Sequence, residues 1–413
     1  MTSADCIVMK WANSLKMIGW RAIASFVAAL FIAGWLSSLA GGFAAVTNAQ
    51  PELMREDKRT ANNSMGDHYL MLVNTALAEK LKPEMLVQFD QSPYDALAVA
   101  FSWNYDTKPA PAVVDIDAHI AGWKKITKKD IWPWVYLNRI VAVDDAQKNP
   151  YTTGPYFHQI QGADLEDKTG ARSAFLQVWA NSLAAARDSH VPGIVCDVEF
   201  YNNYKEYNPA ELARQLGKTT EQTEQLLREL GARMADAAAA QYPDATLWFL
   251  FTGLGIPQEG RAGAQPYLMS PAYVAMGLLE EIQKKHFRLK VLSGGEAGLG
   301  YCEPTLRHFQ QQIKERAAGF APYLQKYNGI LELGGTMTLW QDQDGRKSIC
   351  PDSDAATVED LEPYLQLLLR TYRYNWIYGS GDQGYYAFNH NYAPRFDATI
   401  RKAKSGAMQT PVQ

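Results

Sequence analysis

The residues best suited to chemistry lie in the segment 193-GIVCDVEFYNN-203, where an apolar run leads into two carboxylates, Asp197 and Glu199. Successive side chains of a strand point to opposite faces, so both acids share one face and Cys196 lies on the other. Two carboxylates on one face of a buried strand repel each other and lose hydration, which folding alone does not favour. Acidic groups at the carboxyl end of a barrel strand are typical of catalysis. The alternative is structural, with Asp197 capping the next segment and Glu199 paired to an arginine.

A second acid follows the apolar run at 289–293, which ends in Gly294 and Gly295 and is continued by Glu296. Glycines let the backbone turn sharply and let it approach a ligand closely. We therefore expect Glu296 on the same barrel face as Glu199, two strands further along. The alternative is a loop carboxylate that holds the glycine turn by hydrogen bonds.

Aromatic and amide side chains gather at the ends of the expected strands. Sugars offer apolar ring faces and polar rims, so a sugar cleft combines flat aromatic rings with amides and carboxylates. Each aromatic side chain taken alone is more often part of a core than a binding platform, and only the clustering at successive strand ends favours a binding surface. The candidate substrate-binding residues are Trp103, Trp134, Tyr136, Asn138, Arg139, Tyr201, Asn202, Tyr301, Trp340, Trp376 and Asp382.

Other chemistries lack their residue patterns. The seven histidines form no HExxH or HxH pair, so no metal site is expected. There is no G-x-S-x-G elbow, and 253-GLGIPQEG-260 misses the spacing of a dinucleotide-binding loop. The mildly negative net charge of −4 does not match the basic footprint of a nucleic-acid-binding protein. We therefore expect carboxylate chemistry with no cofactor and no nucleic-acid partner.

Strand-like and helix-like patterns alternate along the chain. Helical spacing of three and four residues is clear at 113–123 and 171–189, and Asn208-Pro209 and Thr219 each begin a further helix. Later helices are expected at 271–285, 304–326 and 357–373. The expected strands are 85–89, 96–101, 132–137, 193–199, 246–251, 289–293, 336–340 and 374–379.

This alternation predicts a parallel sheet in an α/β fold. About eight strands fit a (β/α)₈ TIM barrel with enlarged loops, and the alternative is an open doubly wound sheet. The first strand is ambiguous, because no helix fits between the apolar runs at 85–89 and 96–101.

The amino terminus has the order of a secretory signal. Basic residues precede the apolar run 22–36, small residues follow it, and Ala49–Gln50 is a plausible cleavage point. The run has about fifteen residues, whereas a membrane span needs about twenty. The alternative is an uncleaved anchor that holds the domain on the periplasmic or outer side. The expected organisation is a signal peptide over 1–49, a flexible tether over 50–66, one barrel catalytic domain over 67–405 and a disordered tail over 406–413.

The four cysteines define no disulfide framework. Cys6 lies in the leader, and Cys196 is expected to be a small buried apolar residue. Cys302 and Cys350 could pair in an oxidising compartment.

The segment 193-GIVCDVE-199 resembles the end of the chitinase-type signature of the barrel glycoside hydrolases, in which alternating apolar residues lead to D-x-E. The resemblance implies that Glu199 is the general acid and that Asp197 orients an acetamido group of the substrate. The two earlier acidic positions of that signature are Pro192 and Val195 here. The layout of 193–340 is also similar to uncharacterised exported bacterial glycosidase-like barrel proteins.

The sequence as a whole favours a secreted or periplasmic glycoside hydrolase that acts on a poly- or oligosaccharide. Glu199 would protonate the leaving oxygen, and Glu296 would be the nucleophile or base. If Glu296 is remote, Asp197 takes the second role or the mechanism is substrate-assisted. One alternative is a non-catalytic carbohydrate-binding or cell-envelope protein on a degenerate barrel, which Pro192 and Val195 support. Another is a hydrolase or lyase that acts on a non-glycosidic bond.

Overall fold

The structure, a computed structural model, describes ten segments of the chain, and all of them belong to one compact unit that spans Met65–Gln413. The described residues are 68–78, 81–101, 113–136, 165–168, 170–198, 207–255, 266–299, 305–338, 357–378 and 393–408. Their strands are β1 (Tyr69–Leu77), β2 (Ala96–Ala100), β3 (Asp130–Tyr136), β4 (Gly193–Asp197), β5 (Thr246–Phe249), β6 (Lys290–Ser293), β7 (Leu331–Leu333), β8 (Gly335–Thr338) and β9 (Tyr374–Tyr378).

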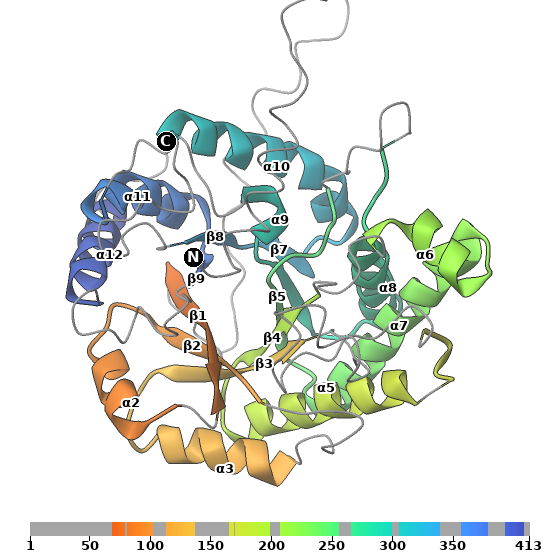
Figure 1. Ribbon diagram of the computed structural model, residues 1–413, viewed down its shortest axis with the longest axis horizontal. Coiled ribbons are helices and arrows are strands. Elements are labelled where there is room, and N and C mark those ends of the chain that lie inside the picture. Colours follow the sequence, from red (N-terminus) through yellow and green to blue (C-terminus); the bar gives the residue numbers. More distant parts are fainter. Residues whose placement is uncertain are drawn as a thin grey trace, which may run out of the picture. The chain divides into compact units, whose positions relative to one another are not determined.

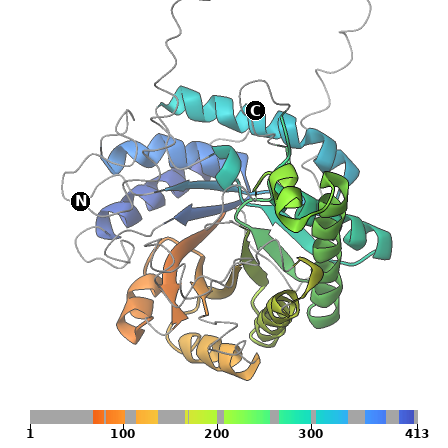
Figure 2. The same ribbon diagram turned by 45° about the vertical axis from the view of Figure 1, so that its right-hand side comes forward.

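Helices alternate with these strands and surround them (Figure 1). The view in Figure 2 shows the same layer of helices outside the strands. The helices are α2 (Pro83–Asp90), α3 (Val113–Trp123), α5 (Ala171–Asp188), α6 (Pro209–Leu216), α7 (Thr220–Gln241), α8 (Ser270–Lys285), α9 (Glu296–Leu299), α10 (Leu306–Lys326), η4 (Glu359–Leu361), α11 (Glu362–Thr371) and α12 (Ala393–Met408).

The strands form one parallel sheet in the order β7-β6-β5-β4-β3-β2-β1-β9-β8. Its two edge strands, β7 and β8, follow each other in the chain with only Gly334 between them. β7 pairs with β6, and β8 pairs with β9, so 331–338 acts as one interrupted strand that joins both edges. The sheet is therefore a nearly closed barrel, as the alternation of strands and helices in the sequence predicts.

Most expected elements are confirmed, and the ambiguity at the first strand is resolved. The expected strand at 85–89 is wrong, because these residues belong to α2, which Pro83 opens at its first turn. Leu86 and Phe89 are its buried residues, a spacing of three that fits a helix. The first barrel strand is β1, which is not among the expected strands. At the other end, α12 continues to Met408, past the expected domain boundary at 405.

Four aromatic side chains fill the middle of the barrel. They come from four different strands, and the ring centroids of contacting pairs lie 5.8–6.5 Å apart. Tyr69 links them to polar groups, because its hydroxyl donates to Asp130 (3.0 Å) and accepts the indole N–H of Trp132 (2.9 Å). Burial, followed by the nearby charge of Asp130, raises the pKa of Tyr69 well above its usual value. The four residues are Tyr69, Trp132, Trp248 and Tyr374.

A buried arginine holds the interruption in the barrel strand. Arg316 of α10 donates to the carbonyl oxygens of Ser293 and Gly334, both at 2.7 Å. Within the described part of the chain no carboxylate pairs with it, and its guanidinium lies 5.3 Å from the ring centroid of Phe320 and 5.1 Å from that of Tyr372. The two carbonyls and two ring faces take the place of water around the charge.

Basic side chains also fasten neighbouring turns at the end of the barrel where strands begin. Each donates to a backbone carbonyl at a helix end or turn of the next segment around the barrel, so it satisfies an acceptor that secondary structure leaves open. The pairs are Lys124 with Ser189 (2.5 Å), Arg187 with Gln241 (2.7 Å), Arg370 with Gly406 (2.7 Å), and Lys290 with Gly329.

We predict that Arg316→Met lowers the free energy of unfolding by about 2–3 kcal/mol, because it leaves the buried carbonyl of Gly334 without a partner. The measurement is urea unfolding followed by circular dichroism. The matched control is Arg395→Met, since Arg395 forms an exposed ion pair with Glu359 and its loss should cost less than about 1 kcal/mol. Equal urea midpoints for the two variants would contradict the role given to Arg316.

Candidate active site

Asp197 closes β4 at the carboxyl end of the barrel and is 1% exposed. Val195 is in register with Trp134 of β3 and with Trp248 of β5, which lies in the interior aromatic group. Because side chains alternate along a strand, Asp197 also points to the barrel interior. A buried carboxylate therefore lies inside the barrel at the end where its strands finish, on the face that the sequence predicts.

Cys196 lies on the opposite face of β4. It is in register with Phe249, whose ring centroid lies 6.3 Å from that of Trp179 of α5, so this face packs against helices. The thiol is free and buried, and burial, followed by the charge of Asp197, raises its pKa well above the usual value. The expectation of a small buried residue on the outward face is confirmed.

Glu296 begins the short helix α9 at the same end of the barrel, beyond β6. Its backbone N–H donates to the carbonyl of Leu250 (3.1 Å), and the N–H of Leu250 donates to the carbonyl of Cys196 (3.0 Å). Two backbone hydrogen bonds thus connect the start of α9, through the end of β5, to the residue before Asp197. Glu296 and Asp197 lie at the carboxyl ends of β6 and β4, with one strand between them.

The two glycines before Glu296 are required by their surroundings. Gly295 has φ +98°, a backbone conformation that residues other than glycine rarely adopt. A Cβ added at Gly294 would lie 2.7 Å from the carbonyl oxygen of Leu250 and 2.7 Å from the indole nitrogen of Trp376. The sharp glycine turn that the sequence predicts is therefore present. It determines where α9 begins and thus the position of Glu296, its first residue.

Trp134 and Trp376, both expected to bind substrate, are buried in the barrel. Trp134 is 4% exposed and Trp376 is 0% exposed. The indole N–H of Trp376 donates to the carbonyl of Gly294 at 2.9 Å. Such burial favours the core role that the sequence left open for each aromatic side chain, and the stacking role expected of Trp376 is not supported.

Most other predicted site residues lie outside the described residues, as does Glu199 itself. The backbone of Tyr136 is described, and Tyr136 is in register with Asp197. The candidates outside the described residues are Trp103, Asn138, Arg139, Tyr201, Asn202, Tyr301, Trp340 and Asp382.

Two buried hydroxyl groups near this end were missed from the sequence. The side-chain oxygens of Thr252 and Ser293 are 3.0 Å apart, and both residues are 1% exposed. Each lies at or just beyond the end of an apolar strand, which is the only signal that could have marked them. In the part of the chain that the structure describes, no group of three or more histidine, cysteine or acidic residues is placed to hold a metal ion.

Comparisons with known proteins give no family. No family model matches the chain, and no curated protein matches it. Among solved structures, a sugar phosphate isomerase/epimerase from Parabacteroides distasonis is 9% identical over 82% of this chain and 98% of its own, with a TM-score of 0.40. A GH18 chitinase from Pseudoalteromonas aurantia is 11% identical over 81% of this chain and 99% of its own, with a TM-score of 0.40.

A third solved structure, the endo-glycoceramidase II of Rhodococcus sp., is 10% identical over 80% of this chain and 78% of its own, with a TM-score of 0.45. Identities and scores of this size carry no conclusion about the activity of this chain. The barrel is established by the strand order of the chain itself.

We predict that Trp376→Ala lowers the free energy of unfolding by about 3–5 kcal/mol, because it empties a fully buried site and leaves the carbonyl of Gly294 without its donor. The matched control is Tyr378→Ala, two residues along the same strand and only half-buried, which should cost less. Thermal unfolding gives the stability and a sugar titration gives the affinity. A Trp376 variant of unchanged stability with weakened sugar binding would restore the stacking role.

Proposed function

We propose that this protein is an exported glycoside hydrolase that cleaves a poly- or oligosaccharide by carboxylate general acid/base catalysis. The observation that carries the proposal is the buried side chain of Asp197, which points into the barrel at the carboxyl end of β4. Glu199 follows two residues further along the chain. A carboxylate kept out of water at this end of a parallel barrel is costly for stability, and active sites of barrel enzymes lie at this end. Glu296 supports the proposal, because it lies at the same end beyond β6.

In this proposal each acid has a separate role. Glu199 protonates the leaving glycosidic oxygen, which is the role that the chitinase-type D-x-E ending implies for this residue. Glu296 acts as the nucleophile or as the base that activates water. If Glu296 is too far from the scissile bond, Asp197 supplies the second carboxylate or the acetamido group of the substrate does.

A non-catalytic carbohydrate-binding protein is the second candidate. Pro192 and Val195 favour it, because they occupy the first two acidic positions of the chitinase-type signature. Val195 is fully buried in the barrel interior, so an apolar residue fills a position where that signature has a carboxylate.

We predict that Glu199→Gln lowers turnover of natural glycosides by a factor on the order of 10²–10⁴, because glutamine cannot donate the proton. Substrates with very good leaving groups need little protonation and should lose far less rate. The assay compares hydrolysis of a polysaccharide panel with that of activated aryl glycosides. Glu229→Gln on the exposed surface of α7 is the matched control and should keep full activity.

Two outcomes would reject this assignment. Equal losses of turnover on natural and activated substrates would show that Glu199 is not the general acid. Glu296 or Asp197 would then be the candidates for that role. A wild-type chain that binds sugars and hydrolyses none of them would favour the carbohydrate-binding candidate.

Export is the second part of the proposal, and it rests on the order of basic, apolar and small residues before Gln50. None of the helices in the described segments has the length and apolar character that a membrane span requires. We predict that amino-terminal sequencing of the protein from its host begins near Gln50. A full-length chain recovered from the cytosol would contradict export, and a full-length chain in the membrane fraction would support the anchor.

A further inference from the structure

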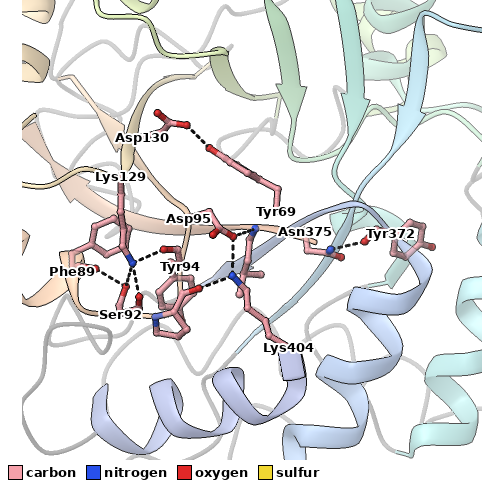
Figure 3. Close-up of polar contacts among 12 residues, drawn as sticks. Tyr69, Phe89, Ser92, Tyr94, Asp95, Lys129, Asp130, Tyr372, Asn375 and Lys404 are labelled. Carbon is pink, nitrogen blue, oxygen red and sulfur yellow. Dashed lines mark hydrogen bonds and ion pairs between the residues drawn. The ribbon is translucent and has the colours of Figure 1, made fainter. Parts of the chain in front are cut away.

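A second polar region lies at the opposite end of the barrel from Asp197 and Glu296, where the strands begin. A hollow of about 720 Å³ opens there. It is lined by residues of the turn 90–95 before β2, by residues 128–130 at the start of β3, and by Arg401, Lys404 and Ser405 of α12. Figure 3 shows the amines of Lys129 and Lys404 meeting this turn. The hollow thus joins segments that are about 300 residues apart in the chain.

The backbone acceptors around the hollow are already used. The amine of Lys129 donates to the carbonyl of Tyr94 (2.5 Å), to the carbonyl of Ser92 and to the Ser92 hydroxyl (3.3 Å). Lys404 donates to the carbonyl of Pro93 at 2.7 Å. Arg401 donates to the carbonyl of Gln91. These contacts hold the turn against α12 and β3.

The three carboxylates of the lining also have partners within the protein. Asp90 accepts the Thr127 hydroxyl (2.7 Å) and the backbone N–H of Lys128 (2.8 Å), which hold its pKa below the usual value. Asp95 accepts the backbone N–H of Leu70 (2.8 Å) and the amine of Lys404 (2.8 Å).

Asp130, the third of these carboxylates, accepts the Tyr69 hydroxyl, and burial raises its pKa. Acceptors at the hollow are therefore largely occupied by the protein.

Donors at the hollow are in excess. A guanidinium carries five N–H groups, and Arg401 has one bond among the described residues. Lys128 is exposed, and its amine has no bond in the described segments. Lys404 uses two of its three N–H groups. Four cations and three carboxylates leave the lining with one net positive charge. This balance favours a ligand that offers acceptors and negative charge.

Two of these cations lie close together on α12. Arg401 and Lys404 are three residues apart on α12, so their like charges lie on one face of the helix. Neither is in the last turn of α12, where a cation would stabilise the helix end. Burial lowers the pKa of Lys129 to about 8, and the charges of Lys404 and Arg401 act in the same direction, against the attraction of Asp95 and Asp90. An anion between these groups would relieve their repulsion.

We propose that this hollow is a binding site for a phosphoryl group, with Arg401 and Lys128 as its main hydrogen-bond donors and Lys404 as a third. A guanidinium and an ammonium match phosphate oxygens in charge and in donor geometry. The group can come from free phosphate or from the headgroup of a phospholipid. The site lies at the opposite end of the strands from the proposed catalytic acids, so it is independent of the hydrolase proposal.

The experiment is a calorimetric titration of the full chain with inorganic phosphate at low chloride. Wild type should bind one phosphate, and Arg401→Gln and Lys128→Gln should each weaken binding about tenfold, as expected for the loss of one charge-assisted hydrogen bond. Lys402→Gln is the matched control. It removes the same charge from the neighbouring residue of α12, which pairs with Glu362 and does not line the hollow, and it should leave binding within about twofold.

Two results would overturn the proposal. One is the absence of saturable binding both to phosphate and to the phospholipid vesicles described below. The other is that Lys402→Gln weakens phosphate binding as much as Arg401→Gln does, which would show an unspecific charge effect. Lys128→Gln keeps the test valid if Arg401→Gln disturbs folding, because Lys128 makes no side-chain bond in the described segments.

A second arm identifies the source of the phosphoryl group. Vesicles of phosphatidylglycerol are compared with vesicles of phosphatidylcholine, and Arg401→Gln and Lys128→Gln are tested on both. Binding to phosphatidylglycerol that both variants weaken assigns the site to a lipid headgroup. Phosphate binding without vesicle binding assigns it to a free phosphate.

Discussion

The two hydrogen bonds from Arg316 to the carbonyls of Ser293 and Gly334 support the closure of the barrel. Between β7 and β8 the chain stops pairing with β6 and begins to pair with β9. An interruption at that point leaves backbone carbonyls inside the protein without partners from the sheet. A guanidinium can serve two carbonyls at once, and the faces of Phe320 and Tyr372 accommodate its charge. Arg316 thereby stabilises the point at which both edges of the sheet meet.

Closure determines where polar chemistry can occur. The four central rings, from Tyr69 to Tyr374, fill the middle of the barrel and separate its two ends. At the carboxyl end, Asp197 and the turn before Glu296 are held by the hydrogen bonds that continue the sheet past β5 and β6. At the other end, lysines and arginines fasten the turns to one another, and around the 90–95 turn they exceed what the turns require. The two ends therefore have different electrostatic character, with the buried carboxylate of Asp197 at one and excess cationic donors at the other.

Much of the fold could be predicted because local patterns matched local structure. The cap at Thr219 is present as a full capping box with Gln222, and the interior face of β4 is the predicted one. The failure at 85–89 has a physical cause. A short apolar run is compatible with a strand or with a buried helix, and only the partners of β1 show that 69–77 occupies the first position in the barrel.

The sequence by itself determined the alternation of strands and helices, the glycine turn before Glu296 and the face on which Asp197 lies, because these depend on neighbours along the chain. The tertiary structure decided which aromatic side chains are core, since Trp376 is buried by a contact with Gly294, 82 residues away in the chain. It also decided how the barrel closes and which cations meet at the hollow. Those features depend on groups from distant segments that no local periodicity records, because burial and charge balance are properties of the packed chain.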